Sequence, residues 1–279
     1  MTDITVVTTF HKPGLDLYGQ RFLDSFAARV DPQIKLLVYA EDCEPYVTAN
    51  NITVLNAAQT LPKLQEFKRK WKGVPKANGI PPADIKAKRR DWNKEFKWDA
   101  VRFANKVYAV FDACERSIDW CVWMDADSYI HTDWSYEEFA KLLPNDKWLT
   151  YVGRGKGSQT WPECGFYGMN LNDSDCIDFL REFEWMYEDA ENGIFTLEEW
   201  HDSFVFGTLL NKHKQIKPNV LDYSAEMYLR EAKTGGGGHP LINGPLGKYM
   251  DHMKGGRKKD GKSKRSDIMV NRTEDYWRT

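Results

Sequence analysis

The chain has 279 residues, of which 42% are hydrophobic and 14% aromatic, which suits one large or two small globular domains. Its formal net charge of −2 hides a strong segregation, because residues 63–106 hold fourteen Lys or Arg against five Asp or Glu, and residues 254–265 hold seven against one. No apolar stretch reaches about 18 residues, which argues against a transmembrane helix.

The five cysteines are odd in number and include no Cys-x-x-Cys pair. This argues against a disulfide framework and against a structural zinc site, so we expect reduced thiols. We also expect no signal peptide and no membrane anchor, because the first residues enter a strand-like run almost at once. The expected location is the cytoplasm of a bacterial or virus-infected host cell.

The first sixty residues alternate between strand and helix patterns. We predict strands at Ile4–Phe10, Ile34–Ala40 and Ile52–Leu55, with a helix at Leu15–Arg29 between the first two. Such alternation favours a parallel sheet with helices on its faces.

Residues 62–95 are rich in Lys and Arg and are punctuated by prolines. We predict one short helix, Lys63–Trp71, followed by an extended basic loop. The simplest interpretation of such a charge run is a solvated surface. The alternative is an anionic partner such as DNA, on whose bases Trp71 and Trp92 would stack.

A long helix is predicted at Phe96–Ser117, because apolar residues recur there at helical spacing. Arg102 and Lys106 stand four residues apart and therefore share one face of this helix. That face either approaches a ligand or holds a structural salt bridge.

The run Trp120–Met124 is entirely apolar and is followed by Asp125-Ala126-Asp127. This pattern predicts a strand buried on both faces. The strand delivers two carboxylates to its carboxyl end, where open α/β sheets bind ligands. Two acids separated by one residue can reach one hard cation. They can also simply cap a turn, so the motif alone leaves both interpretations open.

Further elements follow this motif. Ser135–Glu138 and Thr196–Glu199 have the pattern of capping boxes, and the second places a helix start at Leu197. Asp202 then falls in the first turns of that helix, where an acid either compensates the helix N-terminus or serves a reaction. The remaining predicted elements are strands at Trp148–Val152, Glu163–Asn170 and Ile216–Val220 and an acidic helix at Asp173–Glu191.

Near the C-terminus, His252 is followed by Lys254 and Gly255. A lone His is usually structural. A late His beside a Lys, together with a strand-end Asp-x-Asp, favours a shared site for a metal and an anion. His239 is a rival ligand, although it lacks the following Lys-Gly.

The strand-end Asp125-x-Asp127 and the His252-x-Lys254-Gly255 element resemble the metal motifs of nucleotide-sugar glycosyltransferases of the GT-A type. The resemblance implies an α/β fold with a GT-A-like (Rossmann-like) mixed sheet flanked by helices. It implies a single catalytic domain over residues 1–255, with a basic insertion at about 62–95, and a basic tail at 256–279. The sequence departs from the fuller His-x-x-Gly-x-x-Lys-Pro-Trp pattern of glycogenin-like relatives.

The resemblance also implies roles for particular residues. Asp125, Asp127 and His252 would hold Mn²⁺ or Mg²⁺ beside the diphosphate of a nucleotide-sugar donor, most simply a UDP-sugar. Asp202 would be the catalytic residue: in an inverting reaction it would take the proton of the acceptor hydroxyl, and in a retaining reaction it would only orient or stabilise the reacting groups. The residues expected at the donor are Thr8, Thr9, Phe10, Arg102, Lys106, Asp125 and Lys254.

Other functions stay open at this point. A haloacid-dehalogenase-like phosphatase would use Asp125 as a nucleophile. That resemblance expects the motif on the first strand of the core and a Thr or Val in place of Tyr129. A non-catalytic nucleic-acid-binding protein would use the basic stretches. A combined hypothesis is a transferase that glycosylates modified bases in DNA, as some phage enzymes do, because a polyanionic acceptor would account for the segregated charge.

Overall fold

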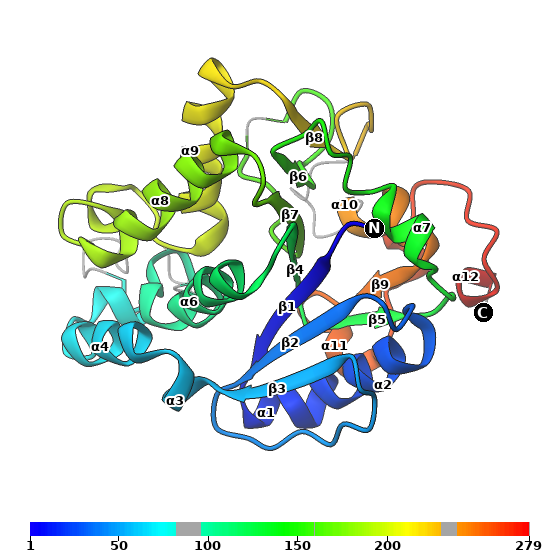
Figure 1. Cartoon of the computed structure of the whole chain (residues 1–279), viewed down its shortest axis with the longest axis horizontal. Helices are drawn as coiled ribbons and strands as arrows, with labels where there is room; N and C mark the ends of the chain where they lie inside the picture. The colour runs from blue at the N-terminus through cyan, green and yellow to red at the C-terminus, as the bar shows by residue number, and fades with distance from the viewer. Residues whose placement is uncertain (82–95, 159, 230–238, 279) are drawn as a thin grey trace.

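The computed structural model describes residues 1–81, 96–158, 160–229 and 239–278 (Figure 1). Most of the predicted basic loop, including Trp92, lies outside these residues. Within them, seven strands form one sheet in the order β3-β2-β1-β4-β7-β6-β8, and two more strands form a separate ribbon, β5-β9. The strands are β1 Ile4–Phe10, β2 Lys35–Ala40, β3 Ile52–Asn56, β4 Trp120–Met124, β5 Ser128–Ile130, β6 Leu149–Tyr151, β7 Phe166–Asn170, β8 Val220–Asp222 and β9 Met250–His252.

The sheet is mixed but mostly parallel. Strands β3, β2, β1 and β4 run parallel to one another, β7 is antiparallel to β4 and β6, and β8 pairs parallel with β6. The architecture is therefore α/β and consistent with a Rossmann-like fold. The predictions of four successive strands, the last of them Trp120–Met124, are confirmed.

The apolar run of β4 faces two separate hydrophobic cores. Cys121 and Trp123 belong to one core, whereas Trp120, Val122 and Met124 belong to the other. Successive side chains of a strand point to opposite faces, so a strand covered on both sides needs apolar residues at every position. This is why the run shows no polar alternation.

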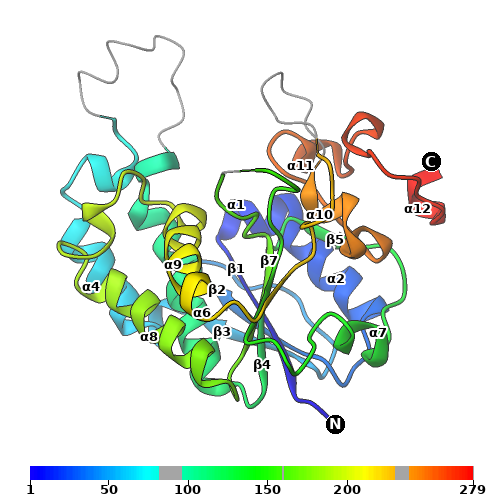
Figure 2. The same cartoon turned by 90° about the horizontal axis from the view of Figure 1, so that it is seen from above.

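Helices cover both faces of the sheet. Figures 1 and 2 show α4, α6, α8 and α9 on one face, and α2, α7 and the β5-β9 ribbon on the other. The α-helical segments are α1 Lys12–Gly14, α2 Gln20–Arg29, α3 Ala57–Thr60, α4 Pro62–Trp71, α6 Ala100–Arg116, α7 Tyr136–Ala140, α8 Ser174–Glu188, α9 Asp202–Ile216, α10 Pro240–Asn243, α11 Arg257–Asp260 and α12 Asp275–Arg278. A π-helical turn at Leu15–Gly19 joins α1 to α2, so the predicted helix at Leu15–Arg29 is present.

Two predictions in the second half of the chain are wrong. The helix expected to begin at Leu197 begins at Asp202, and its N-cap is His201, whose Nδ1 accepts the amide of Phe204 at 3.3 Å. Glu199 is not available for the predicted capping box, because its carboxylate binds Lys97 and His201. The strand expected at Ile216–Val220 lies later, at β8, because α9 continues to Ile216.

Residues 256–278, predicted as a basic tail, pack against the β5-β9 ribbon. The ring of Tyr276 stacks on His131 with centroids 4.3 Å apart, and Trp277 is buried. All five cysteines are free, as expected from their spacing. Among the described residues, no helix is both long and apolar enough to cross a bilayer.

Candidate metal centre

The acidic motif at the end of β4 meets a residue from the end of the chain. Asp125, Asp127 and His252 each offer one ligand atom, and these atoms all lie within 4.8 Å of one another. The ribbon brings them together, because β5 follows Asp127 directly and pairs Ser128 with His252. The amide of Met253 also donates to the carbonyl of Asp127 at 2.8 Å. Backbone hydrogen bonds therefore fix the positions of Asp127 and His252 relative to each other.

His252 is the most enclosed member of the cluster, with 1% of its surface exposed. Its Nε2 lies 3.0 Å from Oδ1 of Asp127 and 3.4 Å from Oδ2 of Asp125. Burial lowers the pKa of His252, but the two carboxylates outweigh burial and raise that pKa to about 10. Burial alone would raise the pKa of both carboxyl groups. Lys106 and His252 bring the pKa of Asp125 below its ordinary value, and His252 does the same for Asp127.

The donor atoms of the cluster suit a divalent cation. Two ionised carboxylates and one imidazole nitrogen around one point are a common set of ligands for such ions. The buried Nδ1 of His252 has no hydrogen-bond partner among the described residues, so the Nε2 side makes the polar contacts of this ring. The residues present therefore fit a metal ion at this place.

Gly165 lies directly behind the imidazole of His252. A Cβ atom at this position would come within 2.8 Å of Cε1 of His252 and 2.7 Å of a methyl carbon of Leu241. The carbonyl of Gly165 also accepts the amide of Asp125 at 2.9 Å. The absence of a side chain at position 165 lets one backbone segment support two members of the cluster.

Lys106 connects the cluster to Asp202. Its Nζ lies 3.3 Å from Oδ1 of Asp125 and 2.8 Å from Oδ2 of Asp202, and it donates to the carbonyl of Cys164. Burial lowers the pKa of Lys106, but Asp125 and Asp202 raise it above its ordinary value. The buried ammonium group of Lys106 thus lies between Asp202, the predicted catalytic residue, and Asp125, a predicted metal ligand.

Lys258 is a member of the site that our sequence interpretation missed. Its Nζ lies 2.8 Å from Oδ2 of Asp127 and 4.8 Å from the ring centroid of Tyr18. The signal was present in the spacing: His252, Gly255 and Lys258 match the first three fixed positions of His-x-x-Gly-x-x-Lys-Pro-Trp. Only the final Pro-Trp is absent. Gly255 has a φ of +64°, a conformation that favours glycine.

Lys254 makes a different contact from the one expected. Its Nζ lies 2.7 Å from Oε2 of Glu163, which Arg154 also contacts at 2.8 Å. Glu163 is buried, and its pKa is held well below the usual value because Lys254 and Arg154 outweigh the effect of burial. His239, the rival metal ligand, packs edge to face against His252 with centroids 4.7 Å apart, and it is outside the cluster of ligand atoms.

The residues predicted at the end of β1 differ in their accessibility. Phe10 is buried and packs against Gly19, and Thr8 is fully buried with a hydroxyl that bonds to no described residue. Thr9 is partly exposed and donates to the carbonyl of Tyr39 at 2.6 Å. Arg102 is exposed on α6, one turn before Lys106.

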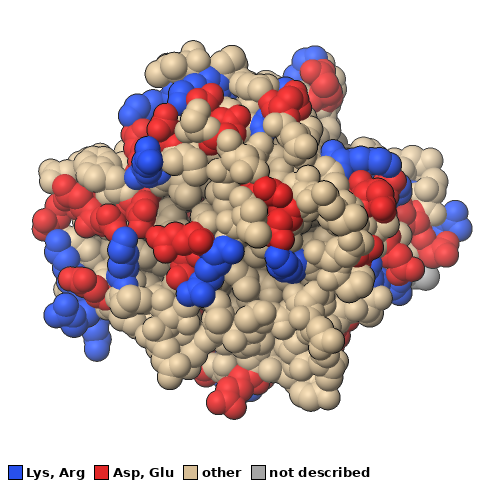
Figure 3. Space-filling model, viewed as in Figure 1, with Lys and Arg blue, Asp and Glu red and all other residues tan. Residues whose placement is uncertain are grey.

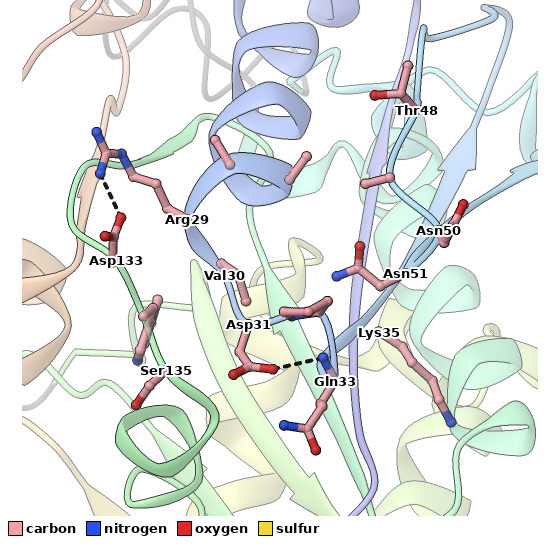
Figure 4. A pocket seen from close by; sticks show the side chains of 15 residues that line it. Arg29, Val30, Asp31, Gln33, Lys35, Thr48, Asn50, Asn51, Asp133 and Ser135 are labelled. Atoms are coloured by element: carbon pink, nitrogen blue, oxygen red, sulfur yellow. Dashed lines mark hydrogen bonds and ion pairs between the residues drawn. The ribbon is translucent and has the colours of Figure 1, made fainter.

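A hollow elsewhere on the molecule is separate from this centre. It has a volume of about 950 Å³ and lies between the end of α2, the start of β2 and the residues before α7 (Figure 4). Its walls include the ion pair of Arg29 and Asp133, 2.8 Å apart, and the turn of Asp31 and Gln33. This is the amino edge of the parallel strands, opposite the carboxyl edge where Asp125 stands.

The charge of the first basic stretch is partly neutralised. Lys63 of α4 contacts Glu184 at 2.9 Å as well as Glu188, both on α8. Trp71 is buried against Phe195, with ring centroids 4.5 Å apart, so the expectation that it stacks on a base is wrong. Figure 3 shows basic and acidic side chains interspersed over the described residues on the face seen in Figure 1.

Comparison with known proteins adds no family assignment. The sequence matches no protein-family model, and no curated protein matches it. The functional argument therefore stands on the geometry of the site.

Proposed function

We propose that this protein is a metal-dependent glycosyltransferase with a GT-A-like domain. It transfers a sugar from a nucleotide-diphosphate donor, most simply a UDP-sugar, to an acceptor hydroxyl. The observation that carries the proposal is the convergence of Asp125, Asp127 and His252 at the carboxyl end of β4. Open α/β sheets bind their ligands at this edge.

The proposed chemistry divides between binding and proton transfer. A divalent cation, Mn²⁺ or Mg²⁺, supplies charge neutralisation at the diphosphate leaving group when it is bound. Lys258 stands beside the carboxylate of Asp127, where its ammonium group is positioned to stabilise the same negative charge. Asp202 accepts the proton of the acceptor hydroxyl. Lys106 holds the carboxylates of Asp125 and Asp202 in a fixed relation.

The position of Asp125 and its contacts argue against the alternative function, a haloacid-dehalogenase-like phosphatase. Asp125 follows β4, which comes after three other strands in the chain, and its Oδ1 accepts the indole N–H of Trp123 at 2.7 Å. That oxygen also lies near Lys106, so the carboxylate is held by its neighbours rather than presented as a free nucleophile. These contacts favour the role of a metal ligand.

The decisive experiment measures thermal unfolding with Mn²⁺ and UDP, added separately and together. A ligand that binds only the folded state raises Tm by mass action. We expect UDP to raise Tm strongly only when Mn²⁺ is present, and we expect Asp127→Asn to remove that increment. Asp133→Asn is the matched control, because the side chain of Asp133 is largely exposed and, among the described residues, forms an ion pair only with Arg29.

Two results would overturn the proposal. One is an equal UDP response in chelator and in Mn²⁺. The other is a full Mn²⁺-dependent response in Asp127→Asn. Hydrolysis or transfer of a UDP-sugar, assayed on the same samples, then identifies the sugar.

A further inference from the structure

The segment after β9 builds a second site on the far side of the ribbon from the metal centre. The carboxylate of Asp251 accepts the amide of Ser263 at 2.8 Å and the hydroxyl of Tyr276 at 2.7 Å. Asp251 and His252 are neighbours in a strand, so their side chains point to opposite faces. The segment therefore packs behind His252, and Figure 2 shows α11 and α12 on the side of the molecule that carries β5.

This segment encloses a hollow of about 520 Å³, a volume within the range of small-molecule sites. Four of the residues that line it are cations, namely Lys262, Arg265, Arg272 and Arg278, and none of the described lining residues is acidic. The indole of Trp277 forms an apolar wall and is fixed by a hydrogen bond from its N–H to the carbonyl of Gly247, at 2.7 Å. The described lining of the hollow is thus predominantly basic, with the carboxylates of Glu274 and Asp275 next to Arg272 and Arg278.

Arg272 is the most enclosed of these cations, with 10% of its side chain exposed. Its guanidinium donates to the carbonyls of Ile242 and Gly244, and the carboxylate of Glu274 stands 3.8 Å away. A Cβ atom on Gly247 would lie 2.5 Å from Nη2 of Arg272, so the chain leaves room for this side chain. Burial lowers the pKa of Arg272. A buried cation held by carbonyl dipoles is stabilised further by an anion.

The other three cations add to this positive charge, and two of them, Arg265 and Arg278, are exposed. Arg278 pairs with Asp275 at 3.0 Å, but both side chains are largely exposed, and such pairs contribute little. Arg265 is exposed and makes no ion pair with any described residue. Lys262 lies over the ring of Tyr276, 4.5 Å from its centroid. Arginine side chains of this kind bind phosphate oxygens through paired N–H groups.

We propose that the hollow lined by Lys262, Arg265, Arg272 and Arg278 is a binding site for the phosphate group of a second ligand, distinct from the donor site. The ligand is a phosphate-bearing molecule of up to about nucleotide size, or one phosphate of a longer phosphodiester chain. The site goes beyond the proposed transferase activity and does not depend on it. It shares one wall with the metal centre, because the hydroxyl of Ser263 donates to the carbonyl of His252 at 3.3 Å.

The test uses the full chain in a buffer with chelator, titrated with inorganic phosphate at constant ionic strength. Binding is followed by calorimetry or by the rise in Tm. Arg265→Gln/Arg278→Gln should weaken phosphate binding by roughly tenfold or more, since two charge-assisted contacts are lost. Lys259→Gln/Lys264→Gln is the matched control: it changes the net charge equally, in the same segment, at residues that do not line the hollow.

The outcomes separate this site from the metal centre. Asp127→Asn should leave the phosphate affinity measured in chelator unchanged. Equal weakening in both double variants would show nonspecific charge attraction and overturn the proposal, as would full affinity in Arg265→Gln/Arg278→Gln. A short single-stranded DNA, added in place of phosphate, tells whether the ligand is a small phosphorylated molecule or a phosphodiester chain. If it binds tightly and loses affinity in the pocket variant, the ligand is a phosphodiester chain, whereas phosphate binding alone identifies a small phosphorylated molecule.

Discussion

Nζ of Lys106 lies 2.8 Å from Oδ2 of Asp202, and both residues are more than 90% buried. The same ammonium group reaches Asp125, so the candidate proton acceptor and the candidate metal ligand share one cation. A change at one carboxylate therefore alters the charge balance at the other. This relationship makes it possible to tell a chemical role of Asp202 from a structural one.

Asp202→Asn should lower turnover by at least about 100-fold while leaving donor affinity within about threefold. The amide keeps the shape of the side chain but cannot accept the acceptor proton. Steady-state kinetics and UDP binding, measured with Tm, check this. Asp175→Asn is the control, because Asp175 also lies in the first turn of a helix, α8, and pairs with a lysine, Lys217. A lower Tm with unchanged turnover would assign Asp202 to a structural salt bridge.

Lys258→Met should have opposite effects on the metal and on the reaction. Removal of a cation 2.8 Å from Asp127 leaves that carboxylate more available, so Mn²⁺ alone should bind about three- to tenfold more tightly. Transfer should fall, because the leaving diphosphate loses a positive partner. Titration with Mn²⁺ followed by kinetics measures both. Lys259→Met, at the next and exposed position, should change neither, and weaker Mn²⁺ binding in Lys258→Met would contradict this role.

Gly165→Ala should damage the metal centre through packing. The new methyl group would approach Cε1 of His252 to 2.8 Å and must displace the ring or the backbone. We expect a loss of about 1–3 kcal/mol in the free energy of unfolding and a weaker response to Mn²⁺. Gly73→Ala is the control, because no atom lies within 4 Å of its added methyl group. An unchanged Mn²⁺ response in Gly165→Ala would show that His252 is not held by this contact.

His131 should make stability sensitive to acid. Burial lowers its pKa from 6.5 to about 4, although the nearby Asp251 acts in the opposite direction. Between these pH values the unfolded chain binds the proton and the folded chain does not, so the unfolding free energy falls as pH falls below 6.5. At pH 5 this costs about 2 kcal/mol. His131→Phe keeps an aromatic ring on Tyr276 and should lose less stability between pH 7 and pH 5 in urea unfolding. Identical losses in the two proteins would refute the assignment.

The part of the fold that local sequence determines was predictable. An unbroken apolar run such as Trp120–Met124 specifies a strand covered on both faces, and the spacing of apolar residues specified α6. The start of α9 was not predictable from its capping pattern. Glu199 is drawn away by Lys97 and His201, and Lys97 is about one hundred residues distant in sequence. A tertiary contact of this kind overrides a local capping preference.

The residues of the candidate site were predictable where they form part of a sequence motif. Asp125, Asp127 and His252 were identified from residue type and order, and the structure brings them together. Lys258 was not predicted, although its spacing from His252 and Gly255 fits the pattern, because Lys259 and Asp260 stand where that pattern has Pro-Trp. The pairing of Lys254 with Glu163 had no sequence signal, because it joins two segments about ninety residues apart, one before β7 and one after β9.

The β5-β9 ribbon also has a consequence for the order of folding. Strands β1 to β4 pair with one another within the first 124 residues, whereas among the described residues Ser128–Ile130 pairs only with Met250–His252. During synthesis, Asp125 and Asp127 are therefore present before His252 and Lys258, and the group of metal-binding side chains stays incomplete until those residues are made. The centre therefore cannot be complete until β9 pairs with β5, and release of this short ribbon would separate His252 from the two carboxylates.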